Sequence, residues 1–265
     1  MQLNIRHVTE YAYDAPVDFA LQKLRLHPLA SQVQTVQDWS VDVSGGKIET
    51  SYTDHYGNHV DLVSAEAGTQ KLSIMASGRV ETRDTAGVLG KFYTRAPLWH
   101  FAQQTTLTEP GDGVKALSEA IGTEKDVLDG LHALSAAILK AVPYETGTTN
   151  ATTTAEGAIA AGKGVCQDHA NIFVAAARIA GLPARYVSGY LLMNDQVDQD
   201  ASHAWAEVHL NDLGWVGFDV SNGVSPDEKY ARIAVGRDAH DAAPIFGLRT
   251  GAGNESMIVS LQVQQ

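Results

Sequence analysis

The chain has 265 residues, and its content of 44% hydrophobic and 19% charged residues is ordinary for a soluble globular protein of one or two domains. Its 31 acidic and 19 basic residues give a formal net charge of −12, so it lacks the basic surface that nucleic-acid binding usually needs and is poorly suited to anionic membranes. A lone cysteine excludes an intramolecular disulfide, and no segment reads as a signal peptide or a membrane-spanning helix. We therefore expect a cytoplasmic protein whose partners include neither nucleic acid nor membrane.

The N-terminal third of the chain has the polar and apolar alternation of β-strands. The alternation is clear at residues 3–7, 24–27, 39–44, 47–54, 72–76 and 79–83, and turn residues separate these runs. Several short strands joined by turns are typical of a β-sandwich. We predict a β-rich domain over residues 1–98.

Two histidines, His55 and His59, flank the turn formed by residues 56–58. They are candidate metal ligands, but the Gly-Asn pair between them supplies the backbone freedom of a tight turn and would leave both histidines exposed. No cysteine or third ligand is clustered with them in the sequence. The pattern therefore favours a plain turn, and we predict no metal site.

The segment 94–110 is the predicted boundary, and its Arg-Ala-Pro-Leu-Trp-His-Phe run is a candidate for docking one domain on the other. After it the apolar residues recur at helical spacing, over 114–121, 127–139 and 155–161. Thr123 is a predicted N-cap for the second of these helices, and Pro143 ends it. Further on, residues 185–192 and 257–263 are predicted strands, and residues 193–201 and 247–254 are predicted loops.

The only cysteine, Cys166, follows two glycines and precedes a run of apolar residues at helical spacing. We expect it where a loop becomes a helix. Free N–H groups in the first turn of a helix favour negative charge, and thus favour the thiolate, the form that attacks carbonyl groups. The alternative that the sequence leaves open is a small buried side chain with no reactive role.

A histidine and an aspartate follow on two strands that a turn connects. His203 lies on the odd-numbered face of the strand 203–210, and Asp219 lies on the returning strand 215–220. Cysteine, histidine and aspartate are the residue types of thiol catalysis, in which the imidazole protonates the leaving group and the carboxylate orients the ring. His169 and His209 compete with His203 for the role of base.

The hairpin makes this pairing testable. A four-residue turn would place His203 and Asp219 on opposite faces, because the numbers of paired residues would then add to an odd sum. For the two side chains to share a face, that sum must be even. We therefore predict a loop of three or five residues, or a β-bulge.

Four blocks, in this order, resemble the bacterial transglutaminase-like family of the papain-like superfamily. They are Gly-Val-Cys-Gln-Asp-His-Ala at 164–170, Ala-Gly-Leu-Pro-Ala-Arg-Tyr-Val-Ser-Gly-Tyr at 180–190, Ser-His-Ala-Trp-Ala-Glu-Val at 202–208 and Gly-Trp-Val-Gly-Phe-Asp at 214–219. The N-terminal part, with Asp-x-Tyr-Gly-Asn at 54–58, resembles the β-rich domain that precedes this core in many members. Two departures stand out: Asp-Val-Ser-Asn at 219–222 replaces Asp-Pro-Thr-Asn, and Ala239 replaces a residue that is commonly aromatic.

The resemblance implies an α+β fold. An N-terminal β-sandwich-like domain at residues 1–98 would precede a papain-like transglutaminase core at residues 99–265, in which helices pack on an antiparallel β-sheet or barrel. It also implies that Cys166 is the nucleophile, His203 the base and Asp219 the residue that orients the base.

The expected activity is that of a thiol-dependent amide-bond hydrolase, a cysteine protease, peptidase or deamidase, acting on a peptide or protein amide through a thioester. The alternatives are a protein-glutamine transglutaminase, which passes the acyl group to an amine, and a non-catalytic binding module on the same fold. Hydrolysis is favoured because nothing in the sequence indicates a dedicated amine site. The mechanism needs no metal or organic cofactor. The N–H of Cys166 is the expected oxyanion donor, and the side chain of Gln167 is a candidate for the second.

Overall fold

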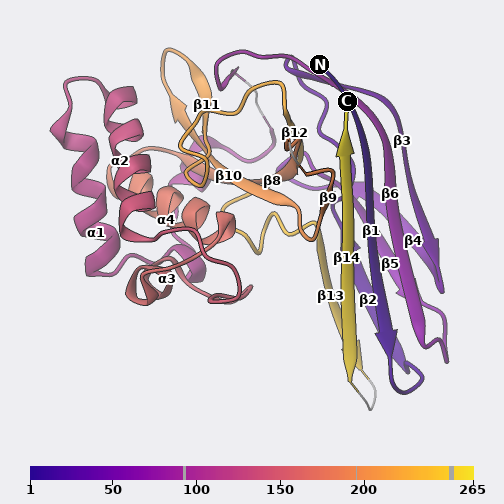
Figure 1. Ribbon diagram of the computed structural model, residues 1–265. Coiled ribbons are helices and arrows are strands. Elements are labelled where there is room, and N and C mark those ends of the chain that lie inside the picture. Colours follow the sequence, from indigo (N-terminus) through magenta and orange to yellow (C-terminus); the bar gives the residue numbers. More distant parts are fainter. Residues whose placement is uncertain (92–93, 195, 251–253) are drawn as a thin grey trace.

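The computed structural model describes residues 1–91, 94–194, 196–250 and 254–265 of the chain. Figure 1 shows the helices gathered on one side of the molecule and the long strands on the other, with a further sheet between them. The N- and C-termini lie side by side, at the same end of the long strands. This mixture of helices and antiparallel sheets agrees with the predicted α+β class.

Two sheets form the sandwich at the side away from the helices. The first has the strand order β3-β6-β1-β14-β9, and the second has the order β13-β2-β5-β4. The strands of the first are β3 (Gln34–Ser44), β6 (Lys71–Thr82), β1 (Gln2–Tyr13), β14 (Glu255–Gln264) and β9 (Asp198–Gln199). Those of the second are β13 (Ile245–Thr250), β2 (Phe19–Leu24), β5 (His59–Ala65) and β4 (Gly46–Thr53). Alternate residues of β1, such as Leu3 and Ile5, are buried, as its sequence pattern predicts.

The sandwich takes strands from both ends of the chain, which corrects the predicted division at residue 98. The strand β14 pairs with β1 from Asn4↔Gln264 to Tyr13↔Glu255, and β13 pairs with β2. Strand β7 (Val88–Gly90), which precedes residue 98, pairs instead with a core strand. The physical reason is that β1 has an open edge, which β14 covers while it buries Leu261 and Val263 in the sandwich.

The C-terminal strands also correct one predicted loop. Residues 245–250 of the structure form β13, although the sequence predicts a loop from residue 247 to 254. Most residues of β13 are exposed or half-buried, so its sequence lacks the apolar alternation by which strands are recognised. Residues 251–253 of that predicted loop lie outside the described residues.

The core sheet carries the helices on one face. Its order is β12-β8-β10-β11-β7, and its remaining strands are β12 (Tyr230–Gly236), β8 (Ala184–Leu191), β10 (His203–Leu210) and β11 (Gly214–Phe218). Ala206 and Val208 of β10 face the helices. Trp205 points to the other side and packs in a second cluster with Trp215 and Tyr230. The sheet is therefore buried on both faces.

Among the described residues, four α-helices pack on this side of the sheet, and all four lie at or within a few residues of the predicted positions. They are α1 (Asp112–Ser118), α2 (Val127–Ala141), α3 (Ala155–Ala161) and α4 (Cys166–Ile179). The N-cap of α2 is Asp126, whose carboxylate accepts from Leu128 N, and not Thr123, which ends a preceding 3-10 helix. Within the described residues, none of the helices is both long and apolar enough to span a membrane.

The Asp-x-Tyr-Gly-Asn turn fastens the sandwich to the core. The Asp54 carboxylate accepts from the N–H groups of Tyr56 and Asn58, both at 2.9 Å, and so closes the turn. The Asn58 side chain is fully buried and exchanges two hydrogen bonds with the backbone of Val235 on β12, at 2.8 and 2.9 Å. The predicted docking segment lies beside it, where Phe101 packs between the rings of Tyr56 and Trp215.

A charged cluster is buried on the face of the core sheet away from the helices. Both oxygens of Glu207 are used: Arg185 donates to Oε2 at 2.7 Å, and Arg232 donates to Oε1 at 2.8 Å. The Arg185 guanidinium also lies 3.8 Å from the centre of the Trp215 ring. Burial would raise the pKa of Glu207, but the two cations hold it below its usual value. The cluster is therefore ionised, and its single carboxylate lies between two buried arginines and balances one of their two positive charges.

Candidate active site

Cys166 is the first residue of α4, which confirms the prediction that it begins a helix. Asp168 shapes this helix start, because its Oδ2 accepts from Val165 N at 2.8 Å and from Thr149 Oγ1 at 2.6 Å. A side chain at Gly164 would come within 2.9 Å of Asp168 Cβ, so glycine leaves the room that this carboxylate needs. The thiol is half-buried, beside the unpaired N–H groups of the first turn.

His203 and Asp219 share one face of the hairpin, as the argument from register requires. Leu210 pairs with Gly214, and the connecting loop has the three residues 211–213. The paired numbers therefore add to an even sum, and the three-residue loop is one of the alternatives that the sequence predicts. Gly214 has φ +75°, a conformation open to glycine at the close of such a loop. As a result, His203 Nε2 donates to Asp219 Oδ2 at 2.6 Å.

Asp219 is fully buried and is held by several donors at once. Besides His203, its Oδ2 accepts from Asn222 Nδ2 at 2.7 Å and from the Tyr230 hydroxyl at 2.8 Å. Burial would raise the pKa of this carboxyl, but these hydrogen bonds and the charge of His203 lower it. Val220 stands where the family has proline, yet paired backbone bonds between Asp219 and Val224 still close the turn.

Aromatic rings confine the imidazole of His203. The Trp205 ring lies nearly parallel to it, with ring centres 6.3 Å apart, and the Tyr230 ring lies 6.0 Å away. The sequence analysis did not single out Tyr230. It lies on β12, a strand that was not predicted, and no spacing in the sequence links it to Asp219. The structure shows that Tyr230 positions the carboxylate and the ring together.

Besides Asp219 and the two aromatic rings, His203 interacts with the thiol of Cys166. Burial alone would lower the pKa of His203, but hydrogen bonds to Asp219 and to Cys166, and the negative charge of both, raise it to about 10. The ring therefore favours its charged form at neutral pH. An imidazolium that faces a thiol at a helix N-terminus stabilises the thiolate.

The other residues that the sequence offered as base or oxyanion donor make contacts away from the thiol. His169 is buried, donates from Nε2 to Val142 O at 2.7 Å and accepts at Nδ1 from Ser221 Oγ at 2.8 Å, so neither ring nitrogen is available as a base. His209 lies at the far end of β10, with its ring against Trp215. The side-chain amide of Gln167, the predicted second oxyanion donor, donates instead to Asn150 O at 3.2 Å.

A tyrosine that the sequence analysis did not identify lies beside the thiol. The backbone of Tyr144 bridges to Gly164, two residues before Cys166. Its phenol is about half exposed, and burial, followed by the negative charges of Cys166 and Asp219, raises its pKa. Tyr144 is therefore a neutral hydrogen-bond donor next to the thiol, on the side open to solvent.

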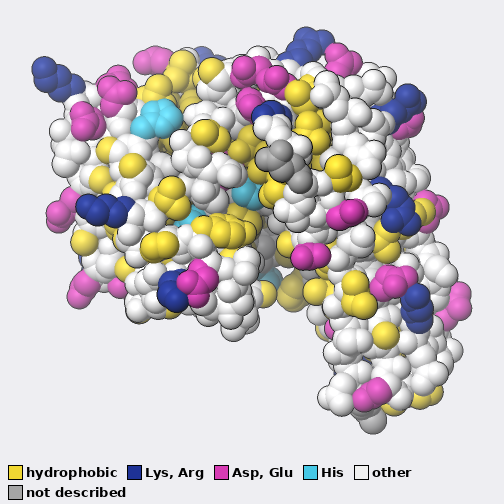
Figure 2. Space-filling model, viewed as in Figure 1, with side chains coloured by type: hydrophobic (Ala, Val, Ile, Leu, Met, Phe, Trp, Pro, Cys, Tyr) yellow, Lys and Arg dark blue, Asp and Glu magenta, His cyan; other side chains and the backbone are white. Residues whose placement is uncertain are grey.

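Acidic and basic side chains are mixed on one face of the molecule. On the face shown in Figure 2, Lys and Arg side chains are scattered among acidic ones rather than gathered in one patch. Within the described residues, two groups could hold a metal ion: His27 with His59 and Asp61, and Asp238 with His240 and Asp241. Neither group includes Cys166, His203 or Asp219.

Comparison with known proteins agrees with this architecture. Residues 115–220 match the model of the transglutaminase-like superfamily, and residues 3–81 match that of the bacterial transglutaminase-like N-terminal region. The chain is 32% identical to an uncharacterized protein of Mycobacterium tuberculosis (strain ATCC 25618 / H37Rv) over 98% of this chain and 91% of that protein. It is 27% identical to an uncharacterized protein of Mycobacterium leprae (strain TN), over 99% and 98% of the two chains.

The fold is also similar to a solved structure. The crystal structure of a "putative cysteine protease" from Cytophaga hutchinsonii superimposes with a TM-score of 0.81 at 24% identity, over 100% of this chain and 90% of that one. At this level of identity the likeness concerns the fold, and it confirms the predicted papain-like arrangement.

Proposed function

The chain belongs to the bacterial transglutaminase-like family, and we propose that it is a thiol-dependent amide-bond hydrolase, acting as a cysteine protease, peptidase or deamidase. In this proposal Cys166 is the nucleophile, His203 the general acid and base, and Asp219 the residue that orients His203. One observation carries it: a single imidazole is hydrogen-bonded to a buried carboxylate and lies close enough to the only thiol of the chain for that thiol to raise the pKa of the ring.

The first half of the proposed reaction forms a thioester. The thiolate sulfur of Cys166 attacks the carbonyl carbon of the amide, and the carbonyl oxygen becomes an oxyanion beside the free N–H groups at the start of α4. The carbon–nitrogen bond then breaks, and His203 gives its proton to the departing nitrogen. Ammonia or an amine leaves, and the acyl group stays on sulfur.

The second half restores the thiol. Neutral His203 takes a proton from water, and the resulting hydroxide attacks the thioester carbon. The carbon–sulfur bond breaks, the carboxylic acid leaves, and the thiolate faces an imidazolium again. Asp219 stays ionised throughout, because its hydrogen bonds keep its pKa low, and it fixes the ring with Nε2–H toward itself and the other nitrogen free for proton transfer.

A cavity on the far side of the residues that hold Asp219 supports a peptide or protein substrate. It has a volume of about 470 Å³, and Asn222 and Tyr230, both bonded to Asp219, form part of its wall. Met193 and Val224 contribute apolar surface to it and are exposed. A wall of apolar, amide and charged groups, the last being Asp227 and Lys229, fits a polar side chain of an extended peptide.

The test is to measure which product forms. The full-length protein is incubated with glutamine-containing peptides, and free acid, ammonia and amine adduct are quantified with and without a primary amine. We expect the free acid to dominate even when the amine is present, because the open side of Cys166 is accessible to water. The Cys166→Ala variant, which lacks the nucleophile, is the matched control and is expected to form neither product.

The other outcomes each contradict the proposal. An amine adduct as the main product would identify a transglutaminase. No thiol-dependent product across a peptide library, from a protein whose thiol also labels slowly, would identify a binding module.

A further inference from the structure

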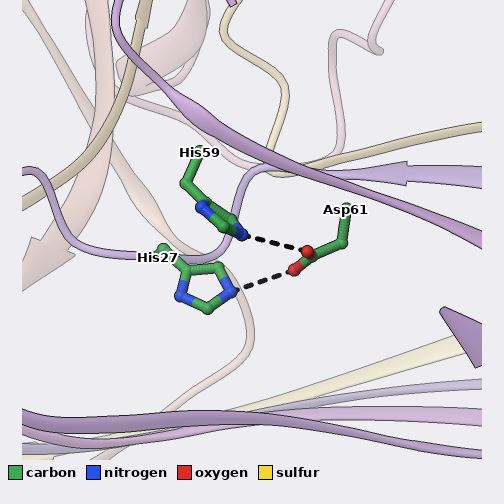
Figure 3. A group of neighbouring side chains, drawn as sticks. All are labelled: His27, His59 and Asp61. Atoms are coloured by element: carbon green, nitrogen blue, oxygen red, sulfur yellow. Dashed lines mark hydrogen bonds and ion pairs between the residues drawn. The ribbon is translucent and has the colours of Figure 1, made fainter. Parts of the chain in front are cut away.

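Three side chains of the sandwich converge at a site that the triad does not use. His59 and Asp61 lie two residues apart on β5, and thus on the same face of that strand, while His27 comes from the loop after β2. Figure 3 shows both imidazoles turning one nitrogen toward the carboxylate of Asp61, each toward a different oxygen. The distances are 2.9 Å from His27 Nε2 to Oδ2 and 3.0 Å from His59 Nε2 to Oδ1.

The spacing of these atoms is close to that of a metal-ligand set. All three ligand atoms lie within 4.8 Å of one another. In a tetrahedral zinc site with bonds of about 2.0–2.2 Å, neighbouring ligand atoms are about 3.3–3.5 Å apart. An ion would therefore need the nitrogen and oxygen atoms to separate by only a few tenths of an ångström, which half-exposed imidazoles can do by small rotations.

The carboxylate is held in place by its surroundings, as a metal ligand usually is. Asp61 is buried, and its Oδ1 also accepts from the hydroxyl of Ser51, the residue opposite it on β4, at 2.5 Å. His27 and His59 remain partly exposed, so solvent and ions can reach their nitrogens. The centres of the two rings are 4.1 Å apart, and the ligand atoms of both lie within 4.8 Å of each other.

The second group of possible metal ligands, Asp238, His240 and Asp241, includes a carboxylate that is less free to bind a cation. In that group the carboxylate of Asp241 is committed to Arg237, at 2.9 Å, and also accepts from the Tyr56 hydroxyl. An arginine in contact with a ligand oxygen competes directly with a cation. His55, which the sequence pairs with His59, packs on Tyr56 with ring centres 3.9 Å apart and is not part of the His27 cluster.

From this geometry we infer that His27, His59 and Asp61 bind one divalent transition-metal ion of the zinc class. Each imidazole binds through Nε2 and keeps its proton at Nδ1, Asp61 binds through its carboxylate, and water occupies the fourth position. Two imidazoles and a carboxylate suit zinc better than magnesium or calcium, which prefer oxygen ligands alone.

The ion would strengthen the contact between the sandwich and the core. Arg25, two residues before His27, donates from its backbone to Pro244 O at 2.7 Å and from its side chain to Ala243 O at 3.3 Å. Fixing His27 to β5 thus fixes the loop that holds this core segment. Because the ion binds only the folded chain, it raises the temperature of thermal unfolding.

The test is a calorimetric titration of the full-length Cys166→Ala protein with zinc chloride. The substitution removes the thiol, which would otherwise bind zinc with His203 and complicate the stoichiometry. We expect one ion per chain, a rise in the unfolding temperature with zinc, and about 100-fold or greater loss of affinity in His27→Gln and His59→Gln. His55→Gln and His240→Gln are the matched controls, and both are expected to bind as the parent does.

Cobalt provides a readout that needs no further variant. A Co²⁺ ion held by two imidazoles, a carboxylate and water gives the intense visible absorption of four-coordinate cobalt, and zinc is expected to displace it. The inference is overturned if neither ion binds the parent protein. It is equally overturned if His27→Gln and His59→Gln bind as the controls do, since the three residues then form only a hydrogen-bonded cluster.

Discussion

Replacing His203 with alanine is expected to lower kcat/KM for amide hydrolysis by about 10⁴-fold, the scale of loss seen when a triad member is removed. The ring is hydrogen-bonded to Asp219 and interacts with Cys166, which raises the pKa of the ring. Without it no acid protonates the leaving nitrogen, and the thiolate loses the charge that stabilises it. Steady-state hydrolysis of a peptide amide, on protein shown to be folded by circular dichroism, measures the effect.

A histidine on the same strand provides the matched control. His209 lies on β10 on the same face as His203 but at the far end, against Trp215. The His209→Gln variant is therefore expected to keep its rate within a few-fold of the wild type. A His203→Ala protein that retains a tenth of the activity or more would contradict the assignment of His203 as acid and base.

The Glu207→Gln substitution is expected to lower the free energy of unfolding by about 3–5 kcal/mol, the usual effect of breaking a buried ion pair from one side. Arg185 and Arg232 are both buried, and each donates to this carboxylate at 2.7–2.8 Å. The amide removes the negative charge and leaves two buried cations that repel each other. Urea denaturation measures the change.

An exposed glutamate provides the comparison. Glu49 pairs with Lys47 at 3.2 Å on the surface of β4, where both side chains are well exposed. The Glu49→Gln variant is expected to unfold at the same urea concentration as the wild type, because an exposed ion pair contributes little to stability. If Glu207→Gln unfolds as Glu49→Gln does, the buried cluster contributes little to stability.

The sequence predicts those structural features whose signals lie within a few residues of one another. Helix α4 begins at Cys166 because glycines precede the cysteine and an apolar helical pattern follows it, and both signals lie within a few residues. If His203 and Asp219 share a face, parity restricts the hairpin to a loop of three or five residues or a β-bulge, and the structure has the three-residue loop. Such predictions need no knowledge of distant segments.

Features that join distant segments were not predictable in this way. Nothing in the alternation of β14 identifies β1, about 250 positions earlier, as its partner, because any open edge of a sheet could accept it. Tyr230 bonds to Asp219 only because β12 lies beside β8 in the core sheet. The histidine that joins His59 is His27 rather than its near neighbour His55, since the pairing of β2 with β5 brings the loop after β2 to Asp61.

The rate at which iodoacetamide labels Cys166, measured against pH for the wild type and for His203→Ala, tests the proposed thiolate–imidazolium pair most directly. His203 has a pKa raised to about 10, so its positive charge is present at neutral and mildly acidic pH and is lost only as the pH rises through that value. We therefore expect wild-type labelling to stay fast well below the ordinary thiol pKa of about 8.5 and to slow at low pH in His203→Ala. Wild-type labelling that declines with falling pH as a free thiol does, and equally in both proteins, would contradict the account.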